Sequence, residues 1–503
     1  MTVRSDPNLS PAERRIGASS DGTNPADRPD PAGRRRVLLY NPQADHPSMP
    51  LGLLAVASAL DRGRFDPRII DARLESRPHE RLLAAVVPGT VCVGMSVLTG
   101  APLGDALAAA RTLKQKHPAL PIVWGGWHPS LFPTACVAEP VVDYAIVGQG
   151  ELAFAELVAR LADGHAAQPL AGCAWRDAQG RPQLGPPRPA QDIGTLPAPD
   201  YELLDVEAYF ALKGRRQLDL VASQGCYWRC AFCADPAVYR RGWSGLDPTV
   251  LAASAGALAD RHGFTDLAFL DETFFTHVER ALAFAALWSR RAQPITWTAT
   301  LRADQGERLT DSQMAVLARS RLRRVLVGVE AGSQAMLDWL QKDIRLAQVM
   351  GTAEKLRRHG IAADFPFIVG LPGESEASVD ASLAWARRLR SMSPAFQTPI
   401  FFYRPYPGSP ITRAAEAAGC RLPDSLEAWA DFDLFGPGPW VAPSLGRRVA
   451  REAFYLRQAW DPPPGRWKLP LRRLARYRLA HHAYGLPFEW QLARWLGHRS
   501  ELH

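Results

Sequence analysis

Residues 223–233 read SQGCYWRCAFC, and they directly follow Leu218–Ala222, an apolar run that is typical of a buried strand. Three cysteines of this loop, Cys226, Cys230 and Cys233, have the spacing C-x3-C-x2-C. Thiolates are the usual protein ligands of iron–sulfur clusters, and three of them can bind three irons of a cubane cluster. A structural zinc site normally needs four protein ligands, and no fourth cysteine or histidine lies close by in the sequence. We therefore predict an iron–sulfur cluster with one open iron. The alternatives are three structural cysteines or a zinc site with a remote ligand.

The segments after this loop alternate between strand-like and helix-like patterns. The expected strands are Leu218–Ala222, Leu267–Leu270, Ile295–Thr300, Val325–Val329, Phe365–Val369 and Thr398–Tyr403. Six β/α units are too few for a closed barrel of eight, so we predict a partial, open (β/α)6 barrel over residues 216–415. Enzymes with β/α barrels place their chemistry at the carboxyl ends of the strands, which is where the cysteine loop begins.

A second alternating series lies closer to the N-terminus. Its expected strands begin at Val37, Arg68, Val91, Ile122 and Tyr144, with helical patterns between them. Such alternation implies a parallel sheet that is covered on both faces, so we predict a doubly wound, Rossmann-like α/β domain over residues 36–165. Ligands of such domains bind beyond the carboxyl ends of the strands. Four of these ends carry glycines, which let a backbone approach a large ligand closely.

Composition excludes several classes of protein. Hydrophobic residues make up 47% and charged residues 22% of the 503 residues, which is ordinary for a folded globular chain. No apolar stretch approaches the ~18–20 residues that span a bilayer, and the N-terminus lacks the layout of a signal peptide. Seven cysteines, four of them scattered, do not form a disulfide framework. We therefore predict a cytoplasmic chain.

Three regions outside the α/β series differ from it in composition. We predict a disordered leader over residues 1–35, a small hairpin and proline-rich linker over residues 166–215, and a basic helical domain over residues 416–503. From Val441 onward the chain has 12 Lys and Arg against 4 Asp and Glu, which accounts for its whole formal charge of +8. Nucleic-acid binding is not expected, because the charge is confined to this tail and no nucleic-acid module accompanies it.

From Leu218 to Pro410 the chain resembles the radical S-adenosylmethionine (SAM) superfamily. The resemblance implies a [4Fe–4S] cluster on the three cysteines, with SAM bound to the open iron through its amino and carboxylate groups. Segments 269–274 (FLDETF), 328–333 (GVEAGS) and 370–374 (GLPGE) match the family at strand ends. The implied SAM-binding residues are Phe232, Asp271, Glu272, Arg302, Glu330, Ser333 and Gly370. Taken singly, each acid could equally be a helix N-cap or a solvated side chain, and each glycine a turn.

Residues 36–162 resemble the cobalamin-binding domain that precedes many radical SAM domains. The likeness is carried by PLGL at 50–53, GGWHP at 125–129 and GQGE at 148–151. The implied cobalamin contacts are Pro50, Leu51, Gly52, Ser96, Leu98, Thr99, Gly125, Gly126, His128, Gly148, Gly150 and Glu151.

One motif of the cobalamin-binding family is missing. Many members carry Asp-x-His-x-x-Gly, whose histidine binds cobalt, whereas this chain has only Asp45-His46-Pro47. We therefore expect cobalt without a histidine ligand, and His46 and His128 at the surface or at the edge of the cofactor. The lower face of cobalamin should instead meet the loop at Val97–Thr99.

The resemblance implies an enzyme with three cofactors: a [4Fe–4S] cluster, SAM and cobalamin. The implied reaction is methylation of an unactivated carbon, or of phosphorus, in a small-molecule substrate after hydrogen abstraction by a 5′-deoxyadenosyl radical. An external electron donor of the flavodoxin or ferredoxin type is expected as a partner. Two alternatives stay open: a cyclisation or rearrangement without net methylation, as in the anaerobic porphyrin-ester cyclases, and a non-catalytic cobalamin or redox sensor.

The region after the last barrel strand is expected to border the substrate. Residues 403–410 read YRPYPGSP, and the prolines restrict this loop. Tyr403 is the catalytic candidate, since it could orient a substrate, although it could equally pack between domains. Residues 466–478 are basic and amphipathic, with Trp490 and Trp495 close behind. Such a segment could contact an anionic membrane, bind an acidic substrate or cap the barrel.

Overall fold

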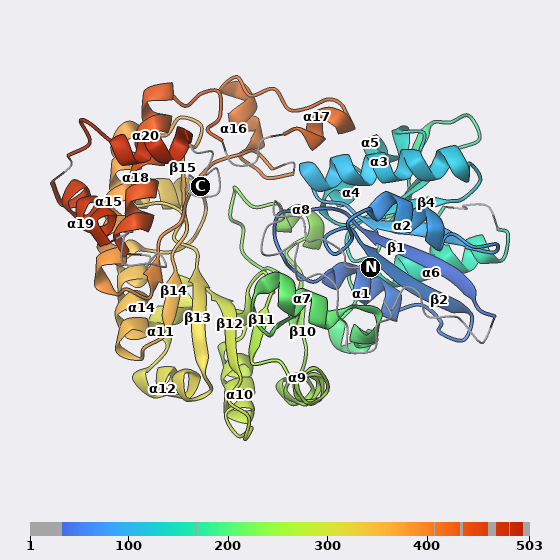
Figure 1. Ribbon diagram of the computed structural model, residues 1–503, viewed down its shortest axis with the longest axis horizontal. Coiled ribbons are helices and arrows are strands. Elements are labelled where there is room, and N and C mark those ends of the chain that lie inside the picture. Colours follow the sequence, from blue (N-terminus) through green and yellow to red (C-terminus); the bar gives the residue numbers. More distant parts are fainter. Residues whose placement is uncertain are drawn as a thin grey trace, which may run out of the picture.

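The computed structural model describes residues 33–165, 169–406, 408–432, 436–460, 469–481 and 483–495. Two α/β units lie side by side, and a helical C-terminal region runs along the same edge of both (Figure 1). Residues 1–32, which are most of the expected leader, and residues 466–468 of the basic segment lie outside the described residues.

The N-terminal unit is built on a seven-stranded sheet with the order β2-β1-β3-β4-β5-β6-β7. Its strands are β1 (Arg35–Asn41), β2 (Phe65–Asp71), β3 (Cys92–Ser96), β4 (Ile122–Gly125), β5 (Tyr144–Ile146), β6 (Cys173–Arg176) and β7 (Pro182–Leu184). Its helices are α1 (Leu51–Ser58), α2 (Pro78–Ala85), α3 (Ala101–Lys116), α4 (Trp127–Leu131), α5 (Pro133–Ala138) and α6 (Glu151–Ala162). Strands β1 to β5 pair in parallel.

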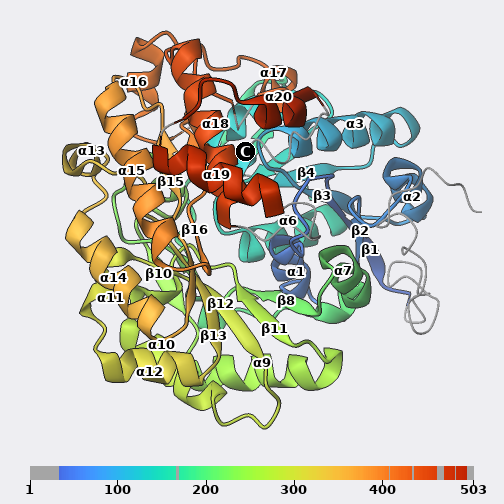
Figure 2. The same ribbon diagram turned by 60° about the vertical axis from the view of Figure 1, so that its left-hand side comes forward.

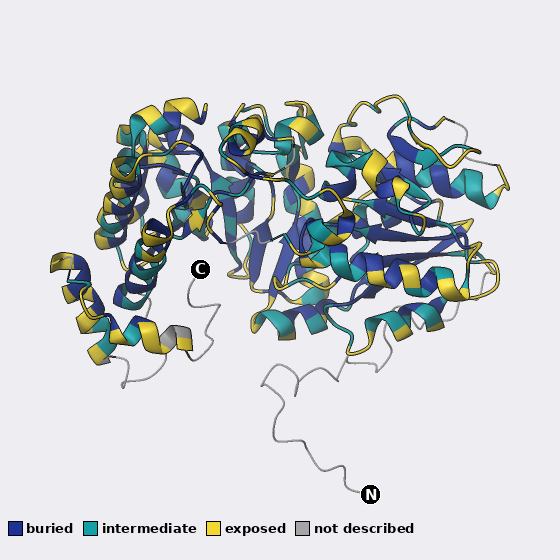
Figure 3. Ribbon diagram, turned by 90° about the horizontal axis from the view of Figure 1, so that it is seen from above, coloured by how far each residue is buried: buried dark blue, intermediate teal, exposed yellow. Residues whose placement is uncertain are grey.

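Successive side chains of β1 face opposite sides of this sheet, because the side chains of a strand alternate in direction. Val37 and Leu39 belong to the core that α6 covers with Phe154. Leu38 and Tyr40 belong to a second core, which α3 covers. The sheet is therefore covered on both faces, and the predicted doubly wound domain is confirmed (Figure 3).

The predicted hairpin is part of this sheet. β6 and β7 are antiparallel to each other, and β6 pairs with β5 through Ala174 and Ala145. The linker then contains two short 3-10 turns, η2 (Ile193–Thr195) and η3 (Tyr201–Leu203), and helix α7 (Val206–Lys213). Its hydroxyl groups join the two units: Tyr209 donates to Asp71 in β2, and Tyr201 donates to the carbonyl oxygen of Asp219 at 2.6 Å.

The second unit is an open, parallel β/α barrel (Figure 2). Its main sheet has the order β16-β14-β13-β12-β11-β8. These strands are β8 (Gln217–Leu220), β11 (Asp266–Phe269), β12 (Thr296–Leu301), β13 (Leu322–Val327), β14 (Ala362–Asp364) and β16 (Phe396–Gln397). Its helices are α9 (Pro248–His262), α10 (Val278–Trp288), α11 (Ala303–Arg308), α12 (Asp311–Arg319), α13 (Gln334–Trp339), α14 (Leu346–Arg358) and α15 (Glu376–Met392).

Two barrel strands are each broken in two, where the sequence predicted continuous strands at Phe365–Val369 and Thr398–Tyr403. The second halves are β15 (Phe367–Val369) and β17 (Ile400–Phe402), which pair with each other apart from the main sheet, and Phe367 also forms an isolated parallel bridge with Glu330. Pro366 and Pro399 stand at the breaks. A proline has no N–H to donate to a ladder, so it ends the pairing at that point.

The cysteine loop leaves the barrel between β9 (Ser223–Gly225) and β10 (Trp243–Gly245), which form a two-stranded antiparallel ribbon. Helix α8 (Asp235–Tyr239) follows the third cysteine, and the turn η4 (Phe274–Thr276) follows β11.

The C-terminal region contains α16 (Thr412–Ala417), α17 (Leu426–Ala430), α18 (Pro443–Trp460), α19 (Leu469–His481) and α20 (Phe488–Trp495). Helix α17 packs on α3 of the N-terminal unit, whereas α18 packs on α15 of the barrel and α19 packs on α18. Helix α18 therefore covers α15 of the barrel, and α19, which contains most of the basic segment, lies on α18; that the basic segment itself caps the barrel stays a prediction. None of the helices in the described ranges is long and apolar enough to span a membrane.

Candidate active site between the two units

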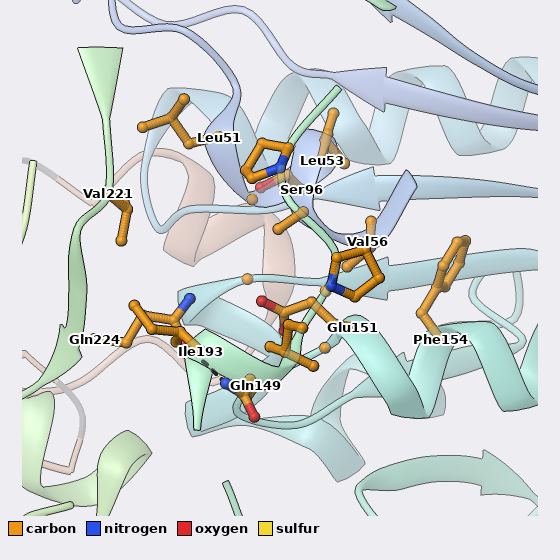
Figure 4. A pocket seen from close by; sticks show the side chains of 18 of the residues that line it. Leu51, Leu53, Val56, Ser96, Gln149, Glu151, Phe154, Ile193, Val221 and Gln224 are labelled. Atoms are coloured by element: carbon orange, nitrogen blue, oxygen red, sulfur yellow. Dashed lines mark hydrogen bonds between the residues drawn. The ribbon is translucent and has the colours of Figure 1, made fainter. Parts of the chain in front are cut away.

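A cavity of ≈ 680 Å³ lies between the carboxyl ends of the N-terminal strands and the first strand of the barrel (Figure 4). Its volume is in the range of about 300–1,000 Å³ that is common for ligand and cofactor pockets. Nine of the twelve predicted cobalamin contacts line it: Leu51, Gly52, Ser96, Leu98, Gly125, Gly126, Gly148, Gly150 and Glu151. From the barrel side it is lined by Leu220, Val221, Gln224, Val238, Tyr239 and Glu272, among others.

The cavity has a mostly apolar interior and a glycine-rich edge. It extends between α1 and α6, where Leu39, Val56 and Phe154 line it. Gly126 has φ +99°, and a Cβ atom there would lie 3.1 Å from the carbonyl oxygen of Val97. Gly94, which the sequence analysis missed, also lines the cavity, and a Cβ atom there would lie 2.8 Å from Leu39. Apolar walls with a glycine-rich, polar edge fit a large ligand that has an apolar face and a polar rim, such as a corrinoid.

The other three predicted cobalamin contacts do not line the cavity. Pro50 is buried at the start of α1. Thr99 is 8% exposed, and its hydroxyl lies 3.0 Å from Nδ1 of His128. His128 is fully buried beside the rings of Phe132 and Trp429. Of the two positions expected for His128, the surface is therefore wrong, because α17 covers it, and the edge of the cofactor stays a prediction; His46 is exposed as expected.

Burial of His128 predicts that stability depends on pH. Burial lowers the pKa of His128 from 6.5 to about 4, so between these values the unfolded chain binds a proton that the folded chain does not. Stability should fall as the pH drops through this window, by up to about 3 kcal/mol. Urea midpoints from pH 7.5 to 4.5 should show a weaker dependence in His128→Gln than in the parent protein. Equal slopes would contradict the assignment.

Two acids after β11 hold the start of the cysteine loop. Asp271 is 2% exposed and accepts hydrogen bonds from the Ala222 N–H at 2.8 Å and the Ser223 hydroxyl at 2.5 Å. Glu272 accepts from the Gly225 N–H at 3.1 Å. Burial raises the pKa of Asp271 to about 6 and that of Glu272 to about 7. Asp271 is thus committed to the backbone of the loop, while Glu272 also faces the cavity.

On its other side the loop is held by the segment at 340–343. The Ala231 N–H donates to the Leu340 carbonyl oxygen at 2.8 Å. Arg302 donates to the Lys342 carbonyl oxygen at 2.7 Å, and its guanidinium reaches the Cys230 sulfur at 3.9 Å. Lys342 pairs with Glu330 at 2.7 Å, and both side chains are buried. Lys342 was missed by the sequence analysis because no motif surrounds it.

The cysteines fit a cluster better than a single ion. Within the described ranges, no group of three or more His, Cys, Asp or Glu side chains converges as the ligands of one ion would. A cubane cluster binds each thiolate through a different iron, so its ligands need not meet at a point. Burial raises the pKa of the Cys226 thiol to about 11, but metal coordination deprotonates a thiol outright.

Three other predicted SAM-binding residues lie in the cysteine loop and after two later barrel strands. Phe232 packs under the Lys342 ammonium, 5.6 Å from its ring centre. Ser333 is half-buried at the start of α13. Gly370 has φ +70°, and its carbonyl oxygen accepts from the Trp440 indole at 2.8 Å.

Tyr403, the catalytic candidate, is 3% exposed, and its ring centre lies 6.3 Å from that of Trp440. Its hydroxyl forms no hydrogen bond of normal geometry with the described residues. Burial raises the pKa of Tyr403 to about 12, an effect that the nearby Ser409 and Thr412 hydroxyls reduce. Among the described residues, the Tyr403 hydroxyl therefore has the nearby Ser409 and Thr412 hydroxyls as its possible partners.

Fold and site together define a two-unit protein in which a doubly wound ligand-binding domain and an open β/α barrel share one cavity beside a three-cysteine loop. Family models agree with each half: residues 36–158 match the B12 binding domain, and residues 220–386 match the radical SAM superfamily. The chain is a radical SAM enzyme with an N-terminal B12-binding domain, and its cofactors are cobalamin, a [4Fe–4S] cluster and SAM.

Individual relatives span both halves. The chain is 27% identical over 387 residues to an uncharacterized methyltransferase of Pyrococcus horikoshii, covering 76% of this chain and 82% of the relative. It is 27% identical over 352 residues to the anaerobic magnesium-protoporphyrin IX monomethyl ester cyclase of Synechocystis, covering 65% and 67%. Among solved structures, the radical SAM methyltransferase TsrM of Kitasatospora setae is 17% identical with a TM-score of 0.67, covering 89% of this chain and 100% of that one. This last likeness concerns the fold.

Proposed function

We propose that this enzyme transfers a methyl group to an unactivated carbon, or to phosphorus, of a small-molecule biosynthetic intermediate. The observation that carries the proposal is the shared cavity, because residues of the B12-binding domain and Glu272, which holds the cysteine loop, line the same space. When bound, cobalamin supplies a transferable methyl group, and SAM with the cluster supplies one-electron activation of an inert bond. The names of a methyltransferase relative and of a methyltransferase of the same fold support this reaction.

The residues of the chain would divide the binding of the cofactors between them. Cys226, Cys230 and Cys233 would hold the cluster, and Glu272 and Glu330 would face SAM. The nine cavity-lining residues of the N-terminal unit, named above, would hold cobalamin, with Leu98 as the apolar neighbour at its lower face. Apolar walls exclude water from the cavity, which protects reactive species from side reactions.

The substrate would enter where three segments meet. The loop after β17 lies against both units: a Cβ atom on Gly408 would lie 3.0 Å from Ala237 in α8 and 3.1 Å from Leu131 in α4. The Ile411 N–H donates to the carbonyl oxygen of Ala231, inside the cysteine loop, at 3.2 Å. We propose that the Tyr403 hydroxyl, at the start of this loop, orients the substrate.

Analysis of products tests the proposal. Reconstituted enzyme would be given reductant, SAM with a deuterated methyl group, and candidate intermediates from neighbouring biosynthetic genes. Methylation predicts a deuterated product, with S-adenosylhomocysteine and 5′-deoxyadenosine formed together. The second candidate function, cyclisation or rearrangement, rests on the cyclase relative. It predicts an unlabelled product without S-adenosylhomocysteine.

Two further partners are part of the proposal. One is an external electron donor of the flavodoxin or ferredoxin type, in the cytoplasm. The other is an anionic membrane surface, because Phe488, Leu492 and Trp495 are 65%, 55% and 81% exposed at helical spacing on α20, next to the basic helix α19. Cosedimentation with anionic vesicles, compared with zwitterionic ones, tests this contact.

A further inference from the structure

Strained backbone surrounds the cysteine loop. Six non-glycine residues of the described chain have a positive φ, and five of them flank this loop: Arg240 (52°), Arg241 (60°), Glu330 (71°), Gln341 (51°) and Asp343 (55°). A left-handed conformation costs a non-glycine residue about 1–2 kcal/mol, and such residues gather at functional sites. Glu330 pairs with the buried Lys342. The other four residues with a positive φ lie toward the outer side of the loop, and that side is where a function for them is expected.

The outer side of the loop carries basic and aromatic side chains, which we call the arginine–aromatic patch: Tyr227, Arg229, Arg240, Arg241 and Trp243. Tyr227 is 42% exposed, and the Arg229 side chain is 56% exposed. Arg240 and Arg241 are exposed, and Arg241 donates to the Tyr227 carbonyl oxygen at 2.9 Å. The ring centres of Tyr227 and Trp243 lie 6.2 Å apart.

The patch has a net positive charge. The carboxylate beside it, Asp343, is already paired with Arg229 at 3.0 Å, which leaves Arg240 and Arg241 to face solvent. An acidic partner would be attracted to this surface, since complementary charge raises association rates by about 10–10³ fold at low salt.

The patch is also the part of the surface next to the predicted cluster ligands. Tyr227 and Arg229 lie in the three-residue segment between Cys226 and Cys230. The third residue of this segment, Trp228, packs under Arg302 with 4.3 Å between guanidinium and ring centre. The opposite side of the loop, through Val238 and Tyr239 of α8, faces the cavity instead. Substrate chemistry and the outer patch are therefore on different sides of the same loop.

We propose that the arginine–aromatic patch is the docking surface for a small, acidic, one-electron carrier protein. The inference rests on the proposed function, because a radical SAM enzyme needs one electron for each SAM that it cleaves. The reduced carrier gives one electron to the cluster site through the segment at 227–229. The carrier is thereby oxidised by one electron, and the cluster site is reduced by one electron. No bond forms or breaks, and no proton moves.

The test uses reconstituted full-length enzyme and a purified acidic flavodoxin in its hydroquinone state. We expect R240E/R241E to lower flavodoxin-driven formation of 5′-deoxyadenosine at least about tenfold at low salt, with dithionite-driven formation unchanged. The matched control is R319E/R357E, which makes the same change of charge on exposed helix residues at the far end of the barrel. The parent rate with flavodoxin should also fall as salt rises.

Each outcome separates the two proposals. If R240E/R241E keeps the parent rate with flavodoxin, the docking surface is wrong. If the parent protein fails to cleave SAM even with dithionite, the proposed function is wrong instead. Should the double variant lose its iron, R240Q/R241Q and Arg229→Gln remove charge more gently, and each should still slow the flavodoxin-driven reaction selectively. A salt-independent parent rate would also overturn the inference.

Discussion

Replacing Cys226, Cys230 and Cys233 together with alanine should remove both the bound iron and all SAM cleavage. The physical reason is that the loop offers these three thiols within eight residues, and three thiolates can bind three irons of a cubane cluster. The loop itself should stay in place, because Asp271 and Leu340 hold its backbone and not its sulfur atoms. Iron content, the visible absorption of the cluster and 5′-deoxyadenosine formation measure the effect.

The matched control replaces Cys92, Cys136 and Cys173, which are fully or almost fully buried in the N-terminal unit. These thiols lie in the apolar cores of the N-terminal unit, away from the cysteine loop, and pack as small apolar side chains. The control should keep its iron, although its stability should fall somewhat. A full iron load in the variant of the loop would falsify the cluster assignment.

The succession of strands and helices along the chain could be predicted from local patterns. Apolar runs and their spacing are properties of short segments, so they indicated both parallel sheets and the place of the cysteine loop. The breaks in two barrel strands were not predicted, although Pro366 and Pro399 lie at them. Each segment was assigned from its run of apolar residues, and a single proline does not change that assignment. The pairing of the hairpin with β5 depends on tertiary contacts and could not be predicted from its sequence.

The sequence predicted those site residues whose place depends on the backbone alone, and it did not predict where side chains point. Glycines at strand ends line the cavity because the carboxyl ends of parallel strands meet at one edge. Side-chain direction is not a local property: His128 turns into the core under α17, and Asp271 turns under the cysteine loop. Lys342 reaches Glu330 through a loop with two residues in the left-handed region, a conformation that no sequence pattern there indicates.

The C-terminal region shows the same limit. Its charge suggested a separate tail, for which removal after Trp440 would be a natural test. The structure shows that α18 contributes Val449, Phe454 and Tyr455 to the core around the barrel. Such a truncation would therefore expose apolar surface and destabilise the barrel, so loss of product would not identify a substrate contact. Substitutions on exposed residues of α20 separate the two effects.

Gly52→Phe should abolish cobalamin binding without harming the fold. Gly52 lies in the first turn of α1 and lines the cavity, and no atom lies within 4 Å of the Cβ that a substitution would add. A large side chain would therefore stand in open space at the edge of the cavity, where it would compete with a large ligand, and would not enter the core; glycine is also a poor helix former, by about 1 kcal/mol relative to alanine. We expect cobalamin affinity to fall at least tenfold, which is about 1.4 kcal/mol, with iron load and melting temperature maintained.

Gly52→Ala is the matched control and should bind cobalamin nearly as the parent does, since one methyl group fills little of ≈ 680 Å³. The amount of cobalamin bound per chain after reconstitution, measured by absorbance, tests this prediction. If Gly52→Phe retains a full complement, cobalamin binds elsewhere, and the shared cavity belongs to another ligand.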